Sequence, residues 1–267
     1  MELKKYLEKA KRGRWAIGQF NFSTLEQLRG ILAAAKKMKS PVIIGTSEGE
    51  LNFLGLLETI ALVEISRSKY GVKAFLNLDH GKNMDLIKKS IDYGYSAVHF
   101  DGSSVPFEKN VKYAKKIVGE AHKKGILAEG EIDDIQKKSL TDAGKAKEFV
   151  EKTKIDSLAV AIGSIHGFYK NIKLDFERLS EIKSNTDVFL VLHGGSGIPD
   201  GQIKKAIALG MNKINVNTEL RMAWKEGISL AFKKGEIKPY NVLTIAQEAV
   251  QKKVEEKIKL FGSFNKI

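Results

Sequence analysis

Residues 72–101 read VKAFLNLDHGKNMDLIKKSIDYGYSAVHFD, and this segment contains the unit from which we predict the fold. It begins with an apolar run, Val72–Leu78, that is long enough for one buried strand. A helical amphipathic segment follows over Asp85–Tyr93, and Asn83 is placed to cap its start. A second apolar run, Ala97–Phe100, comes next. The order strand, helix, strand predicts two parallel strands joined by a crossover helix.

The same unit recurs along the whole chain. The runs that we expect to form strands are Trp15–Phe22, Pro41–Thr46, Val72–Leu78, Ala97–Phe100, Ile126–Ile132, Ser157–Gly163, Val188–Leu192 and Lys213–Val216. Helical periodicity is found over Leu25–Met38, Leu54–Lys69, Asp85–Tyr93, Phe107–Lys123, Lys145–Lys152, Phe176–Lys183, Gln202–Leu209, Glu219–Lys233 and Ile245–Leu260. Eight such units predict an α/β fold that closes into a (β/α)8 TIM barrel. The charged segment Met1–Arg14 adds an N-terminal helix, and the last segment adds a C-terminal helical extension. An open doubly wound sheet is the alternative, but it usually has fewer strands.

Length and composition fit this fold. The chain has 267 residues, and TIM barrels commonly have about 250, so we expect residues 1–267 to form one domain. The absence of cysteine excludes disulfides, thiolate catalysis and cysteine-bound zinc. Met1–Arg14 lacks the apolar core of a signal peptide, and no apolar run approaches the length of a membrane span. We therefore expect a soluble cytoplasmic protein with no membrane partner.

The formal net charge of +13 has three interpretations: nucleic-acid binding, attraction of an anionic substrate, or a lysine-rich solvated surface. The lysines favour the last, because they occur as scattered pairs on helical segments and form no single tract. We expect no nucleic-acid partner. A basic nucleic-acid-binding barrel is the non-enzyme alternative, and it predicts steeply salt-dependent binding without any need for zinc.

Three of the five histidines lie where predicted strands end, which is where TIM barrels carry their chemistry. These are His80, His166 and His193, and each is followed by glycine. Three neutral imidazoles with an open fourth position make a catalytic zinc site. The other two, His99 inside a strand and His122 on a lysine-rich helix, are expected to be structural or solvated.

Two segments near the last strands are suited to bind phosphate. His193–Gly197 can form a nest of successive backbone N–H groups, and Asn215–Thr218 leads into the N-terminus of a helix. TIM barrels frequently bind phosphate after strands seven and eight. The alternative is that the glycines only make turns.

Carboxylates complete the predicted site. Asp79 adjoins His80 and is placed to act as a general acid or base. Asp101 and Glu131 could bind a second cation or hold a ligand in place, whereas Glu129 is interpreted as a supporting or surface group.

Zinc, a phosphate site and a neighbouring carboxylate together suit a retro-aldol reaction. Zinc withdraws electron density from a ketone, and the carboxylate moves the proton on the hydroxyl whose carbon–carbon bond breaks. No lysine at a strand end stands out for an imine route. A metal-dependent hydrolase on the same barrel commonly needs a His-x-His pair on the first strand, and Ala16–Asn21 has none.

The sequence resembles the class II fructose-bisphosphate aldolases, a family that also contains tagatose-bisphosphate aldolases. The resemblance extends over nearly the whole chain and rests on Phe20-Asn21, Pro41–Ile44, Leu78–Gly81, Asp156–Gly163, His166-Gly167, Leu192–Gly197, Lys213–Glu219 and Leu260–Ser263. It implies reversible zinc-dependent cleavage of fructose 1,6-bisphosphate to dihydroxyacetone phosphate and glyceraldehyde 3-phosphate. Tagatose 1,6-bisphosphate or another ketose phosphate is the alternative.

The resemblance also implies roles for single residues. Asp79 becomes the proton donor in cleavage, while the three strand-end histidines bind the zinc. Asp101 and Glu131 match the position of a second divalent cation, and a monovalent cation is a further expectation. Contacts to the sugar phosphate are implied for Asn21, Ser47, Gly167, Gly194, Gly195, Ser196, Asn215, Val216, Asn217 and Thr218. Family members are usually dimers or larger, so we expect a homodimer or homotetramer.

Two departures from the family are visible. After Glu131 the family has a longer loop with two glycines and a glutamate that exchanges a proton on dihydroxyacetone phosphate; here Ile132–Leu140 has neither. Asp133 or Asp134 could take over that proton transfer, the alternative being that both are solvated turn residues. The family's C-terminal helix often carries an arginine that reaches a neighbouring subunit and binds the distal phosphate, and Gln247 stands in that place.

Overall fold

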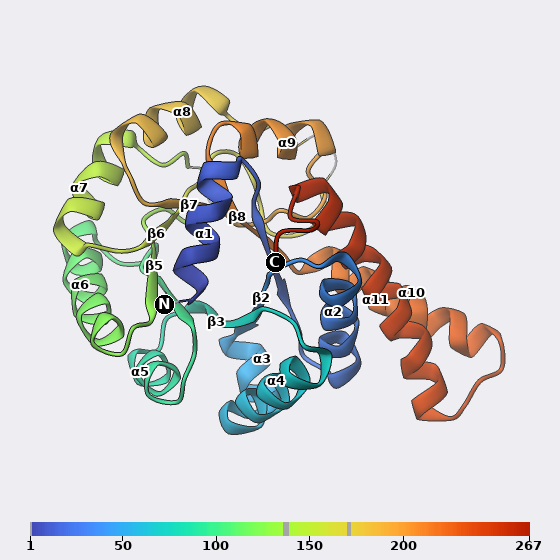
Figure 1. The fold of residues 1–267 in the computed structure, drawn as a ribbon. Coiled ribbons are helices and arrows are strands. Elements are labelled where there is room, and N and C mark those ends of the chain that lie inside the picture. Colours follow the sequence, from blue (N-terminus) through green and yellow to red (C-terminus); the bar gives the residue numbers. More distant parts are fainter. Residues whose placement is uncertain (1, 136–138, 170–171) are drawn as a thin grey trace.

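The computed structural model describes residues 2–135, 139–169 and 172–267 of the chain. Eight parallel strands form a closed barrel in sequence order, with the last strand paired to the first (Figure 1). The strands are β1 (Ile17–Asn21), β2 (Val42–Ser47), β3 (Ala74–Gly81), β4 (Ala97–Asp101), β5 (Leu127–Glu131), β6 (Ser157–Ala159), β7 (Phe189–Leu192) and β8 (Met211–Val216). The predicted TIM barrel is therefore confirmed.

Helices surround this barrel and extend from it at both ends of the chain. They are α1 (Glu2–Gly13), α2 (Leu25–Met38), α3 (Glu48–Leu54), α4 (Leu56–Tyr70), α5 (Met84–Asp92), α6 (Phe107–Lys123), α7 (Ala143–Thr153), α8 (Phe176–Asn185), α9 (Asp200–Ala208), α10 (Thr218–Lys233) and α11 (Pro239–Phe261). The far parts of α10 and α11 project sideways from the barrel beside α2 (Figure 1).

The N-terminal helix α1 closes the amino end of the barrel, across which it lies in Figure 1. Its buried face, which includes Leu3 and Leu7, forms one hydrophobic cluster with residues at the starts of the strands, such as Ile17, Phe75 and Phe189. This packing leaves the carboxyl ends of the strands as the end at which a site can form.

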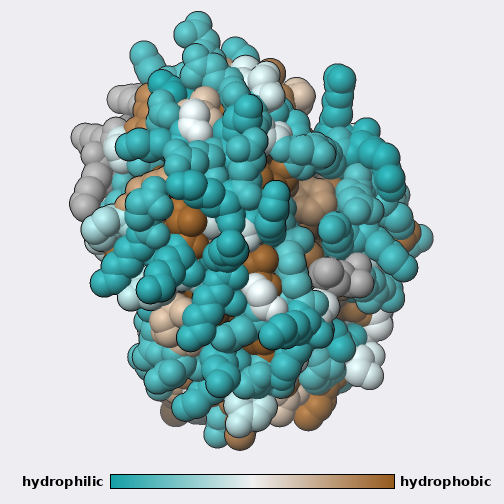
Figure 2. Space-filling view, turned by 90° about the vertical axis from the view of Figure 1, so that its left-hand side faces the viewer, coloured by the Kyte–Doolittle hydropathy of each residue, from teal (hydrophilic) through white to brown (hydrophobic). Residues whose placement is uncertain are grey.

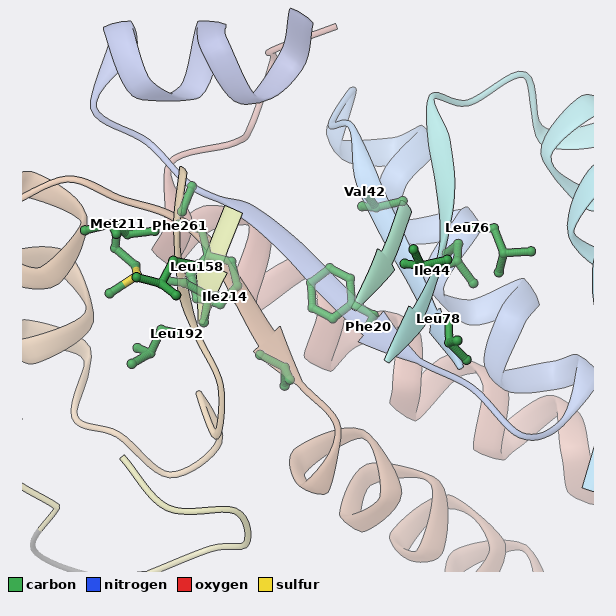
Figure 3. Close-up of a cluster of buried hydrophobic side chains, with 14 of the residues drawn as sticks. Phe20, Val42, Ile44, Leu76, Leu78, Leu158, Leu192, Met211, Ile214 and Phe261 are labelled. Carbon is green, nitrogen blue, oxygen red and sulfur yellow. The ribbon is translucent and has the colours of Figure 1, made fainter. Parts of the chain in front are cut away.

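A second hydrophobic cluster lies between the outer faces of the strands and the surrounding helices. Figure 3 labels some of its members: Phe20, Val42, Ile44, Leu76, Leu78, Leu158, Leu192, Met211, Ile214 and Phe261. Because side chains alternate between the two faces of a strand, Leu76 and Leu78 pack outward while Asn77 lies in the interior, where its Nδ2 donates to Gln19 Oε1 at 2.8 Å. The same alternation directs Asn21, which follows the outward Phe20, to the interior.

Most predicted elements agree with the structure, and α2 and α6 have the predicted bounds. The largest differences concern α11, which begins at Pro239 instead of Ile245, β6, which ends at Ala159 instead of Gly163, and α3, which was not predicted. Beyond Ala159 the backbone leaves the sheet ladder because the Ala161 N–H bonds to Thr141 Oγ1 at 2.9 Å. The chain then turns at Gly163, whose φ is 100°.

Figure 2 shows the face of the molecule that lies on the left in Figure 1, where α6 and α7 are found. Hydrophilic residues cover most of it, and apolar residues form separate small patches. Some of its lysines are paired with acids, such as Lys152 with Glu148 at 2.7 Å. None of the helices in the described part of the chain is long and apolar enough to cross a membrane.

Candidate active site

A pocket opens at the carboxyl end of the barrel. It is lined by Asn21, Ser47, Asp79, His80, His166, Gly167, His193, Gly194, Ser196, Asn215, Asn217, Thr218 and Arg221. The ends of β1, β2, β3 and β8 contribute to it, as do the segments that follow β6 and β7 and the first turn of α10. All of these residues except Arg221 were predicted from the sequence.

The remaining four predicted residues lie outside the lining of this pocket. Asp101 and Glu131 lie behind His80 and are described below. Gly195 and Val216 are buried, and the Gly195 N–H already donates to the Asn215 carbonyl at 3.0 Å. The Gly197 N–H likewise donates to a carboxylate oxygen of Glu219 at 2.8 Å. The predicted nest of backbone N–H groups is therefore only partly available to a ligand.

Asp79 and His80 are consecutive, yet both line the pocket. In a regular strand they would point to opposite faces. The pairing of β3 with β4 shifts register between Leu78 and Gly81, and His80 adopts a φ of 51°, an uncommon conformation for a residue with a side chain. The His80 N–H donates to His99 Nδ1 at 3.0 Å in the barrel interior. This bulge aims both side chains at the barrel mouth.

The three predicted zinc ligands come together. His80 Nε2 lies 2.9 Å from His193 Nδ1. The ring of His166 has its centroid 4.8 Å from that of His80 and 6.3 Å from that of His193. His166 reaches this position from the connection between β6 and α8, seven residues beyond the end of its strand.

A second group of donors lies behind His80. Its Nδ1 is 3.2 Å from Asp101 Oδ2 and 3.5 Å from Glu131 Oε2, and the ligand atoms of these three residues lie within 4.8 Å of one another. Glu131 Oε2 is buried and makes no hydrogen bond within the described part of the chain. His99 Nε2 is 3.2 Å from it, also without a hydrogen bond. Buried polar atoms usually have partners, so unsatisfied donors and acceptors here fit a cation site.

Electrostatics distinguish His80 from His166. Burial favours the neutral form of His80, but the carboxylates of Asp79 and Asp101 outweigh it and raise the pKa of His80 to about 9. Burial and the neighbouring His80 and His193 lower the pKa of His166 to about 3. A cation bound by His80 Nε2 and His193 Nδ1, which lie 2.9 Å apart, would require both nitrogens to be unprotonated.

His193 is fixed from behind by a buried ion pair. Its Nε2–H donates to Glu129 Oε1 at 2.8 Å, and the other carboxylate oxygen accepts from Lys213 Nζ at 2.6 Å. Burial alone would raise the pKa of Glu129, but Lys213 and His193 hold it well below its usual range. With Nε2 protonated, His193 presents Nδ1 to the pocket as a ligand atom.

Two amides fix Asp79. Asn21 Nδ2 donates to Oδ2 at 2.9 Å, and Asn215 Nδ2 donates to Oδ1 at 3.1 Å. Burial disfavours the charge on Asp79, but His80 and His193 keep its pKa below the usual range. The side chain is therefore an ionised carboxylate in a fixed orientation, ready to accept a proton.

Asp133, one of two candidates for proton transfer in the short loop, does not line the pocket among the described residues. Its carboxyl hydrogen-bonds to Thr141 near the start of α7, and burial raises its pKa. This position does not favour Asp133 for a proton transfer at the reacting carbon. The following segment, residues 136–138, lies outside the described residues.

Glu129, interpreted from the sequence as a supporting or surface group, supports His193; it lies two positions before Glu131 on β5 and therefore shares its inward face. The sequence-based interpretation missed Arg221 and Glu50, and a sequence signal could have found Glu50. Glu50 completes the pattern Ser47-Glu48-Gly49-Glu50, and the structure confirms that Ser47 and Glu50 form a capping box at the start of α3.

Comparisons with known proteins identify the family of the chain. A family profile described as "Fructose-bisphosphate aldolase class-II" matches residues 1–266. The fructose-bisphosphate aldolase of Geobacillus stearothermophilus is 38% identical over 281 residues, which covers 100% of this chain and 98% of that relative. The 6-phospho-5-dehydro-2-deoxy-D-gluconate aldolase of Shouchella clausii is 39% identical over 274 residues, with 97% and 94% coverage. The crystal structure of the YdjI aldolase from Escherichia coli K12 superposes with a TM-score of 0.91 at 34% identity, covering 99% of this chain and 98% of that one. The chain belongs to the class II fructose-bisphosphate aldolase family.

Proposed function

We propose that this enzyme is a zinc-dependent aldolase that reversibly cleaves a ketose phosphate into dihydroxyacetone phosphate and an aldehyde. The observation that carries the proposal is the ionised Asp79, fixed by two amides beside three histidines in one pocket. Relatives with two different substrate names are similarly close, at 38% and 39% identity. They support the reaction type more than a particular sugar. Fructose 1,6-bisphosphate is the first substrate to test, with tagatose 1,6-bisphosphate as the alternative.

The pocket suggests how the substrate lies. Gly167, Gly194, Ser196 and the first residues of α10 would hold the dihydroxyacetone phosphate half, where a helix N-terminus favours an anion. Ser47, at the end of β2 and directly beside Asp79 on β3, would face the aldehyde half.

His80, His166 and His193 would hold the zinc, and Asp101 with Glu131 would complete a second cation position. Bound there, the cation withdraws electron density from the ketone oxygen and so favours breakage of the adjacent carbon–carbon bond. In cleavage, Asp79 accepts the proton of the hydroxyl on the carbon that becomes the aldehyde. In condensation it returns that proton, so Asp79 is a proton donor in condensation and not, as the resemblance implied, in cleavage.

A homodimer or homotetramer remains part of the proposal. It is supported by exposed apolar side chains where α10 leads into α11: Phe232 is 61% exposed, Ile237 83% and Tyr240 66%. Phe232 near the end of α10, Ile237 in the connection and Tyr240 at the start of α11 belong to the junction of the two helices, which projects from the barrel (Figure 1).

A coupled cleavage assay on fructose and tagatose 1,6-bisphosphates, with and without chelator, tests the proposal. We expect chelator to abolish turnover and zinc to restore it. The variants His80→Ala, His166→Ala and His193→Ala should each lose both bound metal and activity. Full activity of a preparation shown to be free of metal would refute the metal-dependent mechanism.

The role of Asp79 is tested by Asp79→Asn. This variant keeps the size of the side chain but cannot accept the proton, so turnover should fall by about 10²–10⁴-fold. Metal content and melting temperature should stay close to those of the unaltered enzyme. Normal cleavage by this variant would assign the proton transfer to another group.

A further inference from the structure

Glu50 is a buried carboxylate beside the pocket that the proposed catalytic roles do not use. It is 6% exposed and lies in the first turn of α3. Its two oxygens accept four hydrogen bonds, Oε2 from Asn21 Nδ2 at 3.0 Å and Ser47 N at 2.8 Å, and Oε1 from Asn217 Nδ2 at 3.1 Å and Arg221 Nη2 at 3.0 Å. All four donors belong to residues that line the pocket. Every one of these contacts is a donor, which suits the two acceptor oxygens of a carboxylate.

This carboxylate cancels the positive charge that the pocket offers. Among the described residues that line the pocket, Arg221 is the only lysine or arginine, and it is paired with Glu50. A second acid, Glu48, lies on the same turn of α3 and accepts from the backbone N–H groups of Lys82 and Asn83 at 2.7 and 2.6 Å. The ammonium of Lys82 is itself 3.3 Å from Asp101. The rim around Ser47 therefore has no unpaired cation among these groups.

The hydrogen-bond donors of this rim are also partly used. The Ser47 N–H, which could otherwise bind an anion, already donates to Glu50. A phosphate dianion on the aldehyde half would approach a buried carboxylate with only the remaining donors of Arg221 to balance it, and juxtaposed like charges are strongly unfavourable. A sugar hydroxyl can both donate and accept, so it suits the Ser47 hydroxyl, Glu50 and Arg221 together.

We propose that Glu50 and Arg221 select an aldehyde half that carries hydroxyl groups and no phosphate, so that the substrate is a ketose 1-phosphate instead of a 1,6-bisphosphate. The inference rests on the proposed aldol reaction and names its substrate class. It differs from the bisphosphate expected from the sequence, because the contacts of Glu50 with Asn217 and Arg221 join residues far apart in the chain and follow only from the fold. Selection here works by excluding the wrong substrate as much as by binding the right one.

The test uses the zinc-loaded enzyme in the condensation direction. Dihydroxyacetone phosphate is combined with D-glyceraldehyde or with D-glyceraldehyde 3-phosphate, and kcat/KM is measured for each aldehyde. We expect the unphosphorylated aldehyde to be preferred by about tenfold or more, which corresponds to 1.4 kcal/mol or more of discrimination. Preference for the phosphorylated aldehyde overturns the inference. Absence of condensation with either aldehyde overturns the proposed function itself.

Two variants should move the preference in opposite directions. Glu50→Gln keeps the shape and removes the negative charge, so the ratio of kcat/KM values should shift toward the phosphorylated aldehyde by about tenfold, mainly through KM. Arg221→Met leaves the carboxylate unpaired, and the ratio should shift further toward the unphosphorylated aldehyde. Glu64→Gln on α4, whose side chain is 46% exposed, makes the same charge change away from the pocket and should leave the ratio unchanged.

If Glu50→Gln shifts the ratio no more than Glu64→Gln does, the inference is wrong. If Glu50→Gln fails to fold because the capping box is weakened, the ratio measured for Arg221→Met, at an exposed position, tests the proposal instead. A ratio that Arg221→Met leaves unchanged, or moves toward the phosphorylated aldehyde, then overturns the proposal.

Discussion

Glu129 connects the histidine cluster to the barrel interior by hydrogen bonds. It bonds to His193 on one side and to Lys213 on the other, and both it and Lys213 are almost fully buried. A carboxylate that accepts the second ring N–H of a metal-binding histidine fixes its tautomer and orientation. Removing Glu129 alone would also leave the buried charge of Lys213 unpaired, which is strongly destabilising.

The double variant Glu129→Gln/Lys213→Met separates these two effects, because it removes both charges together. We expect it to fold with a melting temperature near that of the unaltered enzyme but to bind zinc about 10–100-fold more weakly. Competition against a chromophoric chelator measures the affinity. Unchanged affinity in the double variant would mean that Glu129 only balances Lys213.

The chemistry-bearing residues were largely predictable from the sequence, whereas their supports were not. His80, His193 and Asp79 were found because residue type and position at a strand end were sufficient. Lys213 could not be found this way, since its role depends on a contact across the barrel with Glu129, 84 residues earlier in the chain. Such contacts depend on strand tilt and register, which short sequence patterns do not encode.

Among the helices and strands, sequence periodicity predicts the regular elements well, but it does not predict where a regular element is interrupted. The bounds of α2 and α6 follow from uninterrupted amphipathic periods. The bulge in β3 leaves no comparable pattern, although it is what brings Asp79 and His80 to the same side. The end of β6 was also misjudged, because Val160–Ile162 is buried like a strand, whereas from Ala161 on the backbone bonds to Thr141 instead of β7.

The close packing of α10 on α11 predicts that replacing Gly227 lowers the stability of the protein. A Cβ added at Gly227 would lie 2.5 Å from the Cα of Ala246, so the helices approach at backbone distance. Gly227→Ala should therefore destabilise the protein by about 1–3 kcal/mol, as overpacking does. Gly119 on α6 is the matched control, because a Cβ there meets nothing within 4 Å.

Gly119→Ala should stabilise the protein by about 0.5–1 kcal/mol, since alanine is the better helix former. Urea unfolding of both variants gives the two free energies. If the two substitutions stabilise the protein equally, an added Cβ at Gly227 must lie further from the Cα of Ala246 than 2.5 Å.

In the whole molecule the two ends of the barrel have different roles: the amino end contributes to stability, and the carboxyl end carries the proposed chemistry. The amino end is sealed by α1 with apolar side chains from the strand starts, and the carboxyl end concentrates the histidines and carboxylates. Eight repeated units were enough to predict the closed barrel and an N-terminal helix, but that this helix seals the amino end follows only from the three-dimensional packing.

Leu7 on α1 tests this division, because it is 3% exposed and packs with the strand starts at the end of the barrel opposite the pocket. Leu7→Ala leaves a cavity under α1 and should lower the free energy of unfolding by about 2–5 kcal/mol. In a chain of this size each kcal/mol lowers the melting temperature by roughly 2–4 °C. Metal content and kcat, measured well below that temperature, should not change, because the barrel layers between the two ends are rigidly packed.

Leu57→Ala on α4 is the exposed control, at 60% exposure, and should alter stability by no more than about 0.5 kcal/mol. A loss of kcat in folded Leu7→Ala enzyme would show that α1 also shapes the site at the opposite end of the barrel.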